Sequence, residues 1–212
     1  MTLTKEQQEA NKAEFISLIQ SINREGFDKD RLLSNLEASD FFTAPASTKY
    51  HSSFVGGLVQ HSLLVYKNLC RLIPANMQIS QDSIKIVALL HDISKMKYYE
   101  TYYKNQKIYS EKGSKWDSGG RYDWEQIGAY KVREASDRFL YGNHEATSEF
   151  IIRQYCPLTV EESIAILHHH GGMNDDSAKD NVSAIYSRYP LATLLHLADM
   201  YSVYIDESTD KE

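Results

Sequence analysis

Cysteine and proline are both scarce in this chain of 212 residues, which has two cysteines and four prolines. The two thiols, Cys70 and Cys156, stand in unrelated sequence contexts. So small a set argues against a disulfide framework and against a thiolate metal site, and it fits a reducing compartment. We therefore expect both cysteines to be buried small side chains.

Long apolar runs are also absent. No stretch approaches the roughly 20 apolar residues of a membrane-spanning helix, and Met1 to Glu6 lack the apolar core of a signal peptide. We expect a cytoplasmic protein without membrane contact. Positive charge is in deficit, because 23 Lys and Arg against 29 Asp and Glu give a net charge of −6. This balance disfavours extended nucleic acid as a partner but allows a local basic pocket for one nucleotide.

Helical periodicity, by contrast, runs through most of the chain. Thr4 with Gln7, and Thr159 with Glu162, have the spacing of capping boxes. The pattern predicts one all-α bundle, with N-terminal helices at 1–48 packed on a main domain at 49–212. We expect helices from Thr4 to Gly26, around Leu32 to Leu36, over Gly56 to Leu72, from a cap at Asp82 to Asp92, over Trp124 to Phe139, over Asn143 to Tyr155, from Thr159 to a triple histidine, and from Tyr189 past Asp199.

One segment, 98–122, breaks the helical pattern. It is rich in Tyr and Lys, and it alternates loosely around Lys107 to Ser110. Such alternation indicates a β-hairpin or irregular insertion. Its rings and cations suit stacking on a base and holding phosphates, and a self-packed hairpin or a homodimer contact is the alternative. The candidate substrate-binding residues are Lys112, Lys115, Trp116 and Arg121.

His91 and Asp92 are the most informative residues. They follow the apolar run Ile84 to Leu90, and Lys95 comes three positions after Asp92. An imidazole beside a carboxylate offers two ligands to a divalent metal, and the lysine can neutralise a bound phosphate. The dipeptide alone is weak evidence. Further candidates lie in or beside other expected helices: His61, His144, His168, His169, His170 and Asp199.

Nitrogen and oxygen ligands without thiolates favour Zn²⁺, Mn²⁺, Fe²⁺, Co²⁺, Ni²⁺ or Mg²⁺. A metal held in this way lowers the pKa of bound water and polarises a phosphoryl oxygen, and two ions can share the attacking group. The alternative is a set of satisfied buried polar residues, which requires several independent coincidences.

The order His61, His91-Asp92, Asp199 resembles the motif of the HD superfamily of metal-dependent phosphohydrolases, over roughly residues 49–204. The resemblance implies that these four residues hold a first metal ion. Members with two metals carry extra histidines before the last Asp, and His144 and His169 occupy those places, so that they would join Asp92 around a second ion. Other members keep one metal and use these histidines to contact phosphate.

Among proteins of this superfamily, the chain resembles small HD proteins of gut bacteria and their phages. Those proteins have a His-Asp-x-x-Lys segment, an aromatic and lysine-rich insert, a Gly-x-His-Glu-like turn and a Trp-His-Met-Gly-like segment. Here the turn is Gly142-Asn143-His144-Glu145, and the last segment, 168–171, aligns His169 with the retained histidine. The resemblance also implies that Lys95 contacts phosphate.

Other histidines near these positions have two interpretations each. His170 contacts metal or phosphate or is an ordinary polar residue, and His168 either shares that role or faces solvent at a helix end. His196 lies one helical turn before Asp199, where it is expected to orient a ligand. His51 either lines the pocket or is an ordinary loop histidine.

Two charged residues are equally open. Lys95 contacts phosphate or merely complements the dipole of its helix. Glu145, directly after His144, is a proton-transfer group or a surface glutamate.

The pattern favours a phosphohydrolase that cleaves a nucleotide or another small phosphate ester with metal-activated water. Asp92 and Lys95 are the expected catalytic residues. A 3′–5′ exonuclease or phosphodiesterase is one alternative, because the glycine pair before His61 resembles that of bacterial exoribonucleases with HD domains. A non-catalytic sensor that binds a nucleotide without turnover is another.

Overall fold

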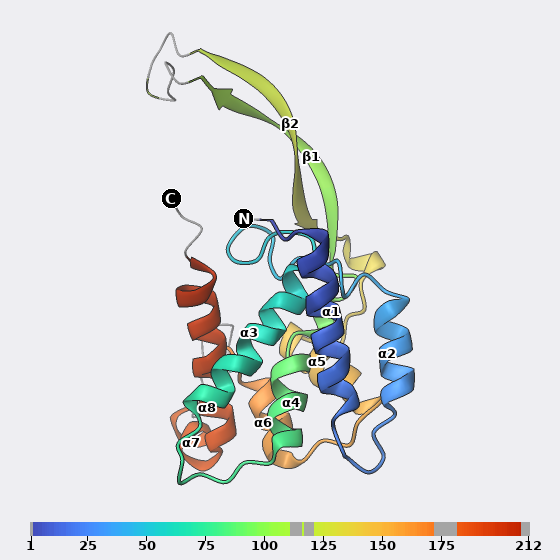
Figure 1. Cartoon of the computed structure of the whole chain (residues 1–212), viewed down its shortest axis with the longest axis vertical. Coiled ribbons are helices and arrows are strands. Elements are labelled where there is room, and N and C mark those ends of the chain that lie inside the picture. Colours follow the sequence, from blue (N-terminus) through green and yellow to red (C-terminus); the bar gives the residue numbers. More distant parts are fainter. Residues whose placement is uncertain (1, 111–115, 117–120, 172–181, 209–212) are drawn as a thin grey trace.

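The computed structural model describes residues 2–110, 116, 121–171 and 182–208. They form a helical body from which a long β-hairpin projects (Figure 1). The helices are α1 (Lys5–Gln20), α2 (Lys29–Glu37), α3 (Gly57–Leu72), α4 (Gln81–Leu90), α5 (His144–Arg153), α6 (Val160–Leu167), α7 (Val182–Arg188) and α8 (Pro190–Tyr201). Short 3₁₀ turns η1 (Ile93–Lys95) and η2 (Ala135–Asp137) flank the hairpin, and a π-helical turn, η4 (Ser202–Asp206), follows α8.

Helix α4 lies at the centre of the core, because Ile84 and the run Ile86 to Leu90 are all buried. An α-helix that is apolar all round must be covered by other elements. Here α3 packs against α4 and α8, and α1 covers both α3 and α4. Phe15 and Ile19 of α1 belong to the same buried cluster as the α4 residues. Every helix in the described ranges is too short or too polar to span a bilayer.

Both expected capping boxes are confirmed. The Thr4 hydroxyl accepts from the Gln7 amide and the Gln7 side chain accepts from the Thr4 amide, and Thr159 and Glu162 do the same at α6. The expected cap at Asp82 is wrong, because α4 begins at Gln81 and its N-cap is Ser80, two residues before Asp82. The Asp82 carboxylate instead accepts a hydrogen bond of 3.1 Å from the Asn23 amide, just beyond α1.

The prediction of an all-α HD-domain bundle is wrong. The protein is mixed, because strands β1 (Tyr99–Tyr109) and β2 (Tyr122–Val132) form an antiparallel two-stranded sheet beside the helices. The helix expected over 124–139 is replaced by most of β2 and by η2. Aromatic and β-branched side chains such as Trp124, Ile127 and Tyr130 favour a pleated strand. The hairpin therefore extends well beyond the insertion expected at 98–122.

The register gives the hairpin one aromatic face. Tyr109 pairs with Tyr122 and Lys107 with Trp124, and side chains paired directly across a sheet point to the same face. The Lys107 ammonium lies 4.0 Å from the centroid of the Tyr122 ring. The strands lead away from the helical body (Figure 1). Of the candidate substrate-binding residues, Trp116 and Arg121 are exposed, whereas Lys112 and Lys115 lie outside the described residues.

Candidate metal centre

His61 is carried by the second turn of α3, and a pair of glycines fixes where this helix begins. Gly56 has a left-handed backbone with a φ of 82°. A Cβ atom on Gly57 would collide with the backbone oxygen of Ser52. The preceding loop therefore lies directly on the start of α3, which places the ring of His51 5.2 Å from the ring of His61. Close backbone approach is a structural reason for the Gly-Gly segment before His61.

His91 and Asp92 lie where α4 ends. His91 is the C-cap of α4, and Asp92 precedes the 3₁₀ turn η1. Both side chains are fully buried, with exposed fractions of 0% and 1%. The change from α-helix to 3₁₀ turn lets two consecutive side chains face the same interior space.

A first group of ligand atoms surrounds Nε2 of His61. This atom lies 3.3 Å from Nε2 of His91, 3.2 Å from Oδ1 of Asp199 and 3.6 Å from Oδ2 of Asp92. Nε2 of His91 is 3.5 Å from the same Asp92 oxygen. Because α8 packs against α3, Asp199 is delivered from the far end of the sequence to the same point as His61.

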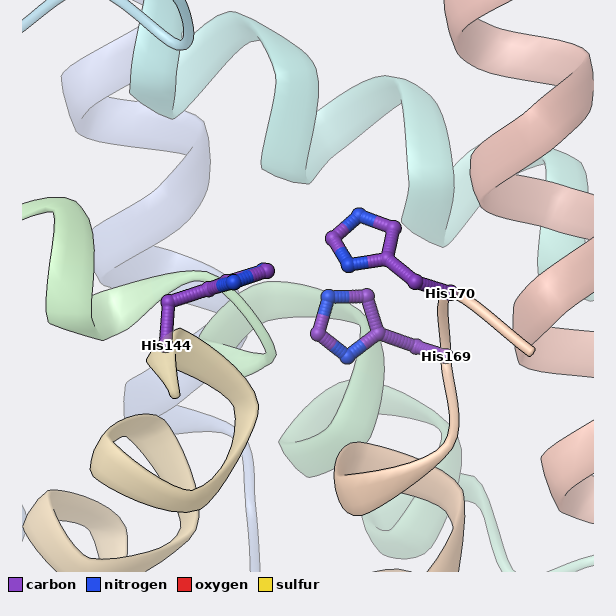
Figure 2. A group of neighbouring side chains, drawn as sticks. All are labelled: His144, His169 and His170. Carbon is purple, nitrogen blue, oxygen red and sulfur yellow. The ribbon is translucent and has the colours of Figure 1, made fainter. Parts of the chain in front are cut away.

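A second group gathers around the other oxygen of Asp92. Nε2 of His144 and Nε2 of His169 each lie 3.7 Å from Asp92 Oδ1. Figure 2 shows these two rings directed toward one another, from the start of α5 and from the segment after α6 respectively. His170 lies beside them, with its ring centroid 4.1 Å from that of His169. Asp92 thus contacts one set of imidazoles with each carboxylate oxygen.

The five histidines share one orientation, in which Nδ1 contacts a protein oxygen and Nε2 faces the centre. Nδ1 of His91 donates to the Ala88 carbonyl at 2.9 Å, and Nδ1 of His169 donates to the Ile166 carbonyl at 2.6 Å. An acceptor at Nδ1 fixes the tautomer that leaves Nε2 as a lone-pair donor. The remaining three imidazoles contact carboxylates.

Glu145 orients two of these three. Its Oε2 lies 3.1 Å from Nδ1 of His144, and its Oε1 lies 2.9 Å from Nδ1 of His170. The side chain is buried, so the interpretation of Glu145 as a surface glutamate is wrong. His170 also reaches Asp199 Oδ2 at 3.5 Å, and it therefore links the second ligand group to the first.

Glu207 orients the fifth imidazole, and sequence analysis missed it. Its Oε1 lies 3.1 Å from Nδ1 of His61. In an α-helix, a residue eight positions after Asp199 would lie about 80° around the axis from it. The π-helical turn takes in one extra residue, closed by the Glu207 amide donating to the Ser202 carbonyl at 2.9 Å, and this brings Glu207 back to the face of Asp199.

Asn68 of α3 contacts the first and last residues of this π turn. Its amide donates to Ser202 Oγ at 2.9 Å and to Asp206 Oδ2 at 2.7 Å. Since α3 also carries His61, the carboxylate of Glu207 and the imidazole that it contacts are held on one framework.

His196 and His168 have supporting positions. His196 Nδ1 donates to the His169 carbonyl at 2.6 Å, so it orients the backbone of a ligand. His168 is the C-cap of α6, and its carbonyl accepts from the Tyr186 hydroxyl. The groups of described residues that could hold a metal contain His169 and His170 but not His168. Gly171 lets the chain after the histidines pass close to Tyr186 and His196. Its φ is 63°, and a Cβ atom there would press on both side chains.

Burial and neighbouring charges shift the pKa values of the groups in the centre. Burial opposes ionisation of Asp92, but Lys95 and His91 hold the pKa of this carboxyl well below its usual range. Burial lowers the pKa of His144 to about 3 and also lowers that of His169. Burial opposes protonation of His61 as well, yet the carboxylates of Glu207 and Asp199 raise its pKa to about 10. Ionised carboxylates and neutral imidazoles are the forms that bind a cation, so His61 must release a proton when a metal ion binds.

Lys95 is the one lysine within this group of residues. Its ammonium lies 2.6 Å from Asp92 Oδ2, and the side chain is nearly buried. Burial opposes the charge, but Asp92 raises the pKa of Lys95 above its ordinary value. The group therefore stays a cation at neutral pH, directly beside the bridging carboxylate.

The donor set fits a metal ion. Asp92 Oδ1 and the Nε2 atoms of His144 and His169 are buried without a hydrogen-bond partner in the described part of the chain. Buried polar atoms normally have partners. Ligands about 2.1 Å from one ion lie about 3 to 3.5 Å from each other, close to the separations found here. The buried His and Asp clusters could therefore hold a metal ion.

Two cavities meet the centre at different ligands. The larger, of about 350 Å³, reaches His170 and Asp199 and is also lined by Lys49, Tyr50, His51, Met200, Val203, Tyr204 and Ser208. The interpretation of His51 as a pocket residue therefore agrees with its position. The smaller, of about 120 Å³, reaches His144 and is lined by Ser94, Tyr98, Arg138, Phe139, Leu140, Gly142, Asn143 and Thr147.

The structure thus brings together residues that the sequence separates widely: His61, His91, Asp92, Lys95, His144, His169, His170 and Asp199. Comparison of the chain with protein-family models, with curated proteins and with solved structures finds no match. The case for a function therefore depends on the geometry of this centre.

Proposed function

We propose that this protein is a metal-dependent phosphohydrolase acting on a nucleotide or a similarly small phosphate ester. One observation carries the proposal: the Nε2 atoms of four oriented imidazoles converge on the two oxygens of Asp92, and that of a fifth, His170, contacts Asp199. Such convergence costs stability if no cation is bound, because it buries polar atoms without partners.

The ligands divide naturally between two positions. His61, His91, Asp92 and Asp199 would hold a first ion, in the order that resembles HD phosphohydrolases. His144, His169 and the second oxygen of Asp92 would hold another. Imidazole and carboxylate ligands suit Mn²⁺, Fe²⁺, Zn²⁺, Co²⁺ or Ni²⁺, with Mg²⁺ as a weaker match for so many nitrogens.

Divalent ions held in this way supply a Lewis acid for a phosphoryl oxygen and lower the pKa of water. The residues of the chain supply the rest. Glu145 and Glu207 hold the rings of His144, His170 and His61 in place, so that no reorientation is needed when substrate binds. Lys95 is a permanent cation beside Asp92, where it can hold a phosphate oxygen by a charge-assisted hydrogen bond.

The larger cavity supports a small organic substrate. Its volume of about 350 Å³ is in the range of small-molecule sites, and Asp199 and His170 lie at its inner end. Tyr50 and Tyr204 offer aromatic surface, and Lys49 supplies a cation near Tyr50. A phosphate at the centre would then leave the organic part of the ester in this cavity.

The test is chromatographic detection of hydrolysis products formed by metal-stripped protein resupplied with Mn²⁺, Co²⁺ or Ni²⁺. The substrates are nucleoside mono-, di-, tri- and cyclic phosphates. We expect hydrolysis that depends on added metal and stops with EDTA. Absence of hydrolysis with every metal and substrate, from protein shown to bind metal, would contradict an enzymatic role and favour a binding protein.

A further inference from the structure

The smaller cavity beside His144 has the chemistry of an anion site. We propose that it binds a second phosphate group of the substrate, next to the one that reacts. Arg138, at the end of η2, is the charged residue that lines it. That the anion belongs to a substrate rests on the proposed function. That the cavity binds an anion does not.

Within the described ranges, Arg138 is a cation without an anionic partner. Its Nε atom is buried and has no hydrogen-bond partner among the described residues, and no ion pair joins its guanidinium to a carboxylate in those ranges. The guanidinium lies over the Tyr98 ring, 4.8 Å from the centroid, which holds it in place without neutralising it. Partly buried charges are normally paired, so this arrangement fits a ligand that brings the negative charge.

Two neutral side chains add donors to the cavity. Ser94 Oγ accepts a hydrogen bond from Ser148 at 2.9 Å, which leaves its own proton to donate. Asn143 uses Oδ1 to cap the Ala146 amide, and this leaves the two protons of its Nδ2. No carboxylate is among the described residues that line the cavity. Donors and a cation without a carboxylate select an anion over a metal ion.

The size and position of the cavity indicate which anion. A volume of about 120 Å³ admits a group of a few atoms, since one water accounts for about 30 Å³ in the liquid. The cavity meets the centre at His144, whereas the larger cavity meets it at His170 and Asp199. A substrate with its reacting phosphate at the centre can therefore place an organic group on one side and a second phosphate on the other. Nucleoside diphosphates and other compounds with two neighbouring phosphates belong to this class.

The anion site can be tested without metal or turnover. Protein labelled with ¹⁵N is kept in EDTA and titrated with inorganic phosphate, while the Nε–Hε signal of Arg138 and the amide signals of residues 143–147 are followed. We expect saturable shifts in the parent and their loss in Arg138→Gln. Arg188→Gln, which removes an exposed arginine that lies over Tyr189, should behave like the parent.

Folding of the variants is checked by thermal denaturation. If Arg138→Gln does not fold, Arg138→Lys serves instead, because it keeps the charge but lacks the guanidinium fork. Phosphate should then bind more weakly than in the parent. Absence of a saturable shift at Arg138 in the parent would overturn the proposal, and so would unchanged binding in the variants.

A kinetic comparison tests the assignment to a second phosphate. With Mn²⁺-loaded protein, Arg138→Gln should raise the KM for a nucleoside 5′-diphosphate about tenfold or more, as expected for loss of a charge-assisted contact. The KM for the 5′-monophosphate of the same nucleoside should stay within about twofold. Equal increases for both would overturn the assignment, because Arg138 would then contact the reacting phosphate.

The anion site and the proposed function can be contradicted independently. Phosphate binding at Arg138 without hydrolysis of any ester would retain the anion site and reject the proposed function. Metal-dependent hydrolysis without phosphate binding at Arg138 would retain the function and reject the anion site.

Discussion

Nδ1 of His61 lies 3.1 Å from Oε1 of Glu207, and both side chains are buried. The contact joins α3 to the π turn after α8 and directs Nε2 of His61 toward Asp92 and Asp199. Loss of such an orienting carboxylate typically weakens metal binding by about 10- to 100-fold. We expect that loss for Mn²⁺ in Glu207→Ala, measured by isothermal titration calorimetry.

Glu207→Gln distinguishes charge from geometry, since its amide oxygen still accepts from Nδ1. Its loss of Mn²⁺ affinity should be smaller than that of Glu207→Ala. Glu14→Gln, which alters a half-exposed ion pair with Lys67, is the control and should bind like the parent. Parental affinity in Glu207→Ala would show that this carboxylate does not orient a metal ligand.

The second group of ligands predicts a difference in metal stoichiometry. His144→Ala and His169→Ala should each lower the number of bound ions from two toward one, because both rings face Asp92 Oδ1 and not Oδ2. Binding to the first group should persist. Elemental analysis of the parent and both variants, each saturated with Mn²⁺, measures the change. One ion per chain in the saturated parent would contradict the two-ion arrangement.

The buried ion pair of Glu162 predicts how stability depends on pH. Arg24 donates to both carboxylate oxygens of Glu162, at 2.6 and 3.0 Å. Burial raises the pKa of Glu162, but the hydrogen bonds from Arg24 lower it by more than this. The net pKa therefore lies below the ordinary value of 4.5. A carboxylate with a lowered folded-state pKa adds stability that is present above its unfolded pKa and is lost as the pH falls through the folded value.

Glu162→Gln should therefore lower the free energy of unfolding by about 2–4 kcal/mol at pH 7. The difference from the parent should shrink as the pH falls below about 4.5, the ordinary pKa of the group. Urea denaturation at pH 7, 5 and 3.5 measures it. A difference that stays constant over this range would mean that packing, and not the charge, carries the contribution.

Most ligands of the centre could be predicted from the sequence, because their residue types and their positions relative to the expected helices can be read directly from it. The His91-Asp92 pair follows an apolar helix, and each further ligand except His61 lies at or near the end of a helical pattern. Glu207 could not be predicted, because its face depends on a π turn that has no clear sequence signal. Arg138 was not singled out either, because a helix was expected over 124–139, where the structure has most of β2 and η2.

The hairpin shows the limit of periodicity as evidence. Its strands contain charged residues on both faces, such as Lys107 on one face and Lys104 on the other, so the alternation of apolar and polar residues is weak. A short insertion within an all-α bundle was therefore expected, whereas the strands run from Tyr99 to Val132. Exposed two-stranded sheets bury little apolar surface, and this leaves only aromatic and β-branched preference as a signal.

The outer part of the hairpin can be removed as a test of its role. Replacing residues 105–126 with a two-residue turn keeps the base of the hairpin, where Arg133 donates to the Tyr99 carbonyl. Because the outer strands are largely exposed, we expect unchanged Mn²⁺ affinity and thermal stability. A higher KM for nucleotides, with hydrolysis of p-nitrophenyl phosphate unchanged, would assign the hairpin to substrate binding. Loss of bound metal would contradict the prediction.

Asp92 provides the most direct test of the metal centre as a whole. It is the carboxylate that contacts the first group of imidazoles through one oxygen and the second group through the other. The measurement is the rate at which Mn²⁺-loaded Asp92→Ala hydrolyses the best substrate of the screen, compared with the parent. The proposed function predicts that hydrolysis is abolished while circular dichroism still shows a folded helical protein. A folded variant that retains activity within about tenfold of the parent would contradict the assignment, because removing a central catalytic group costs more than this.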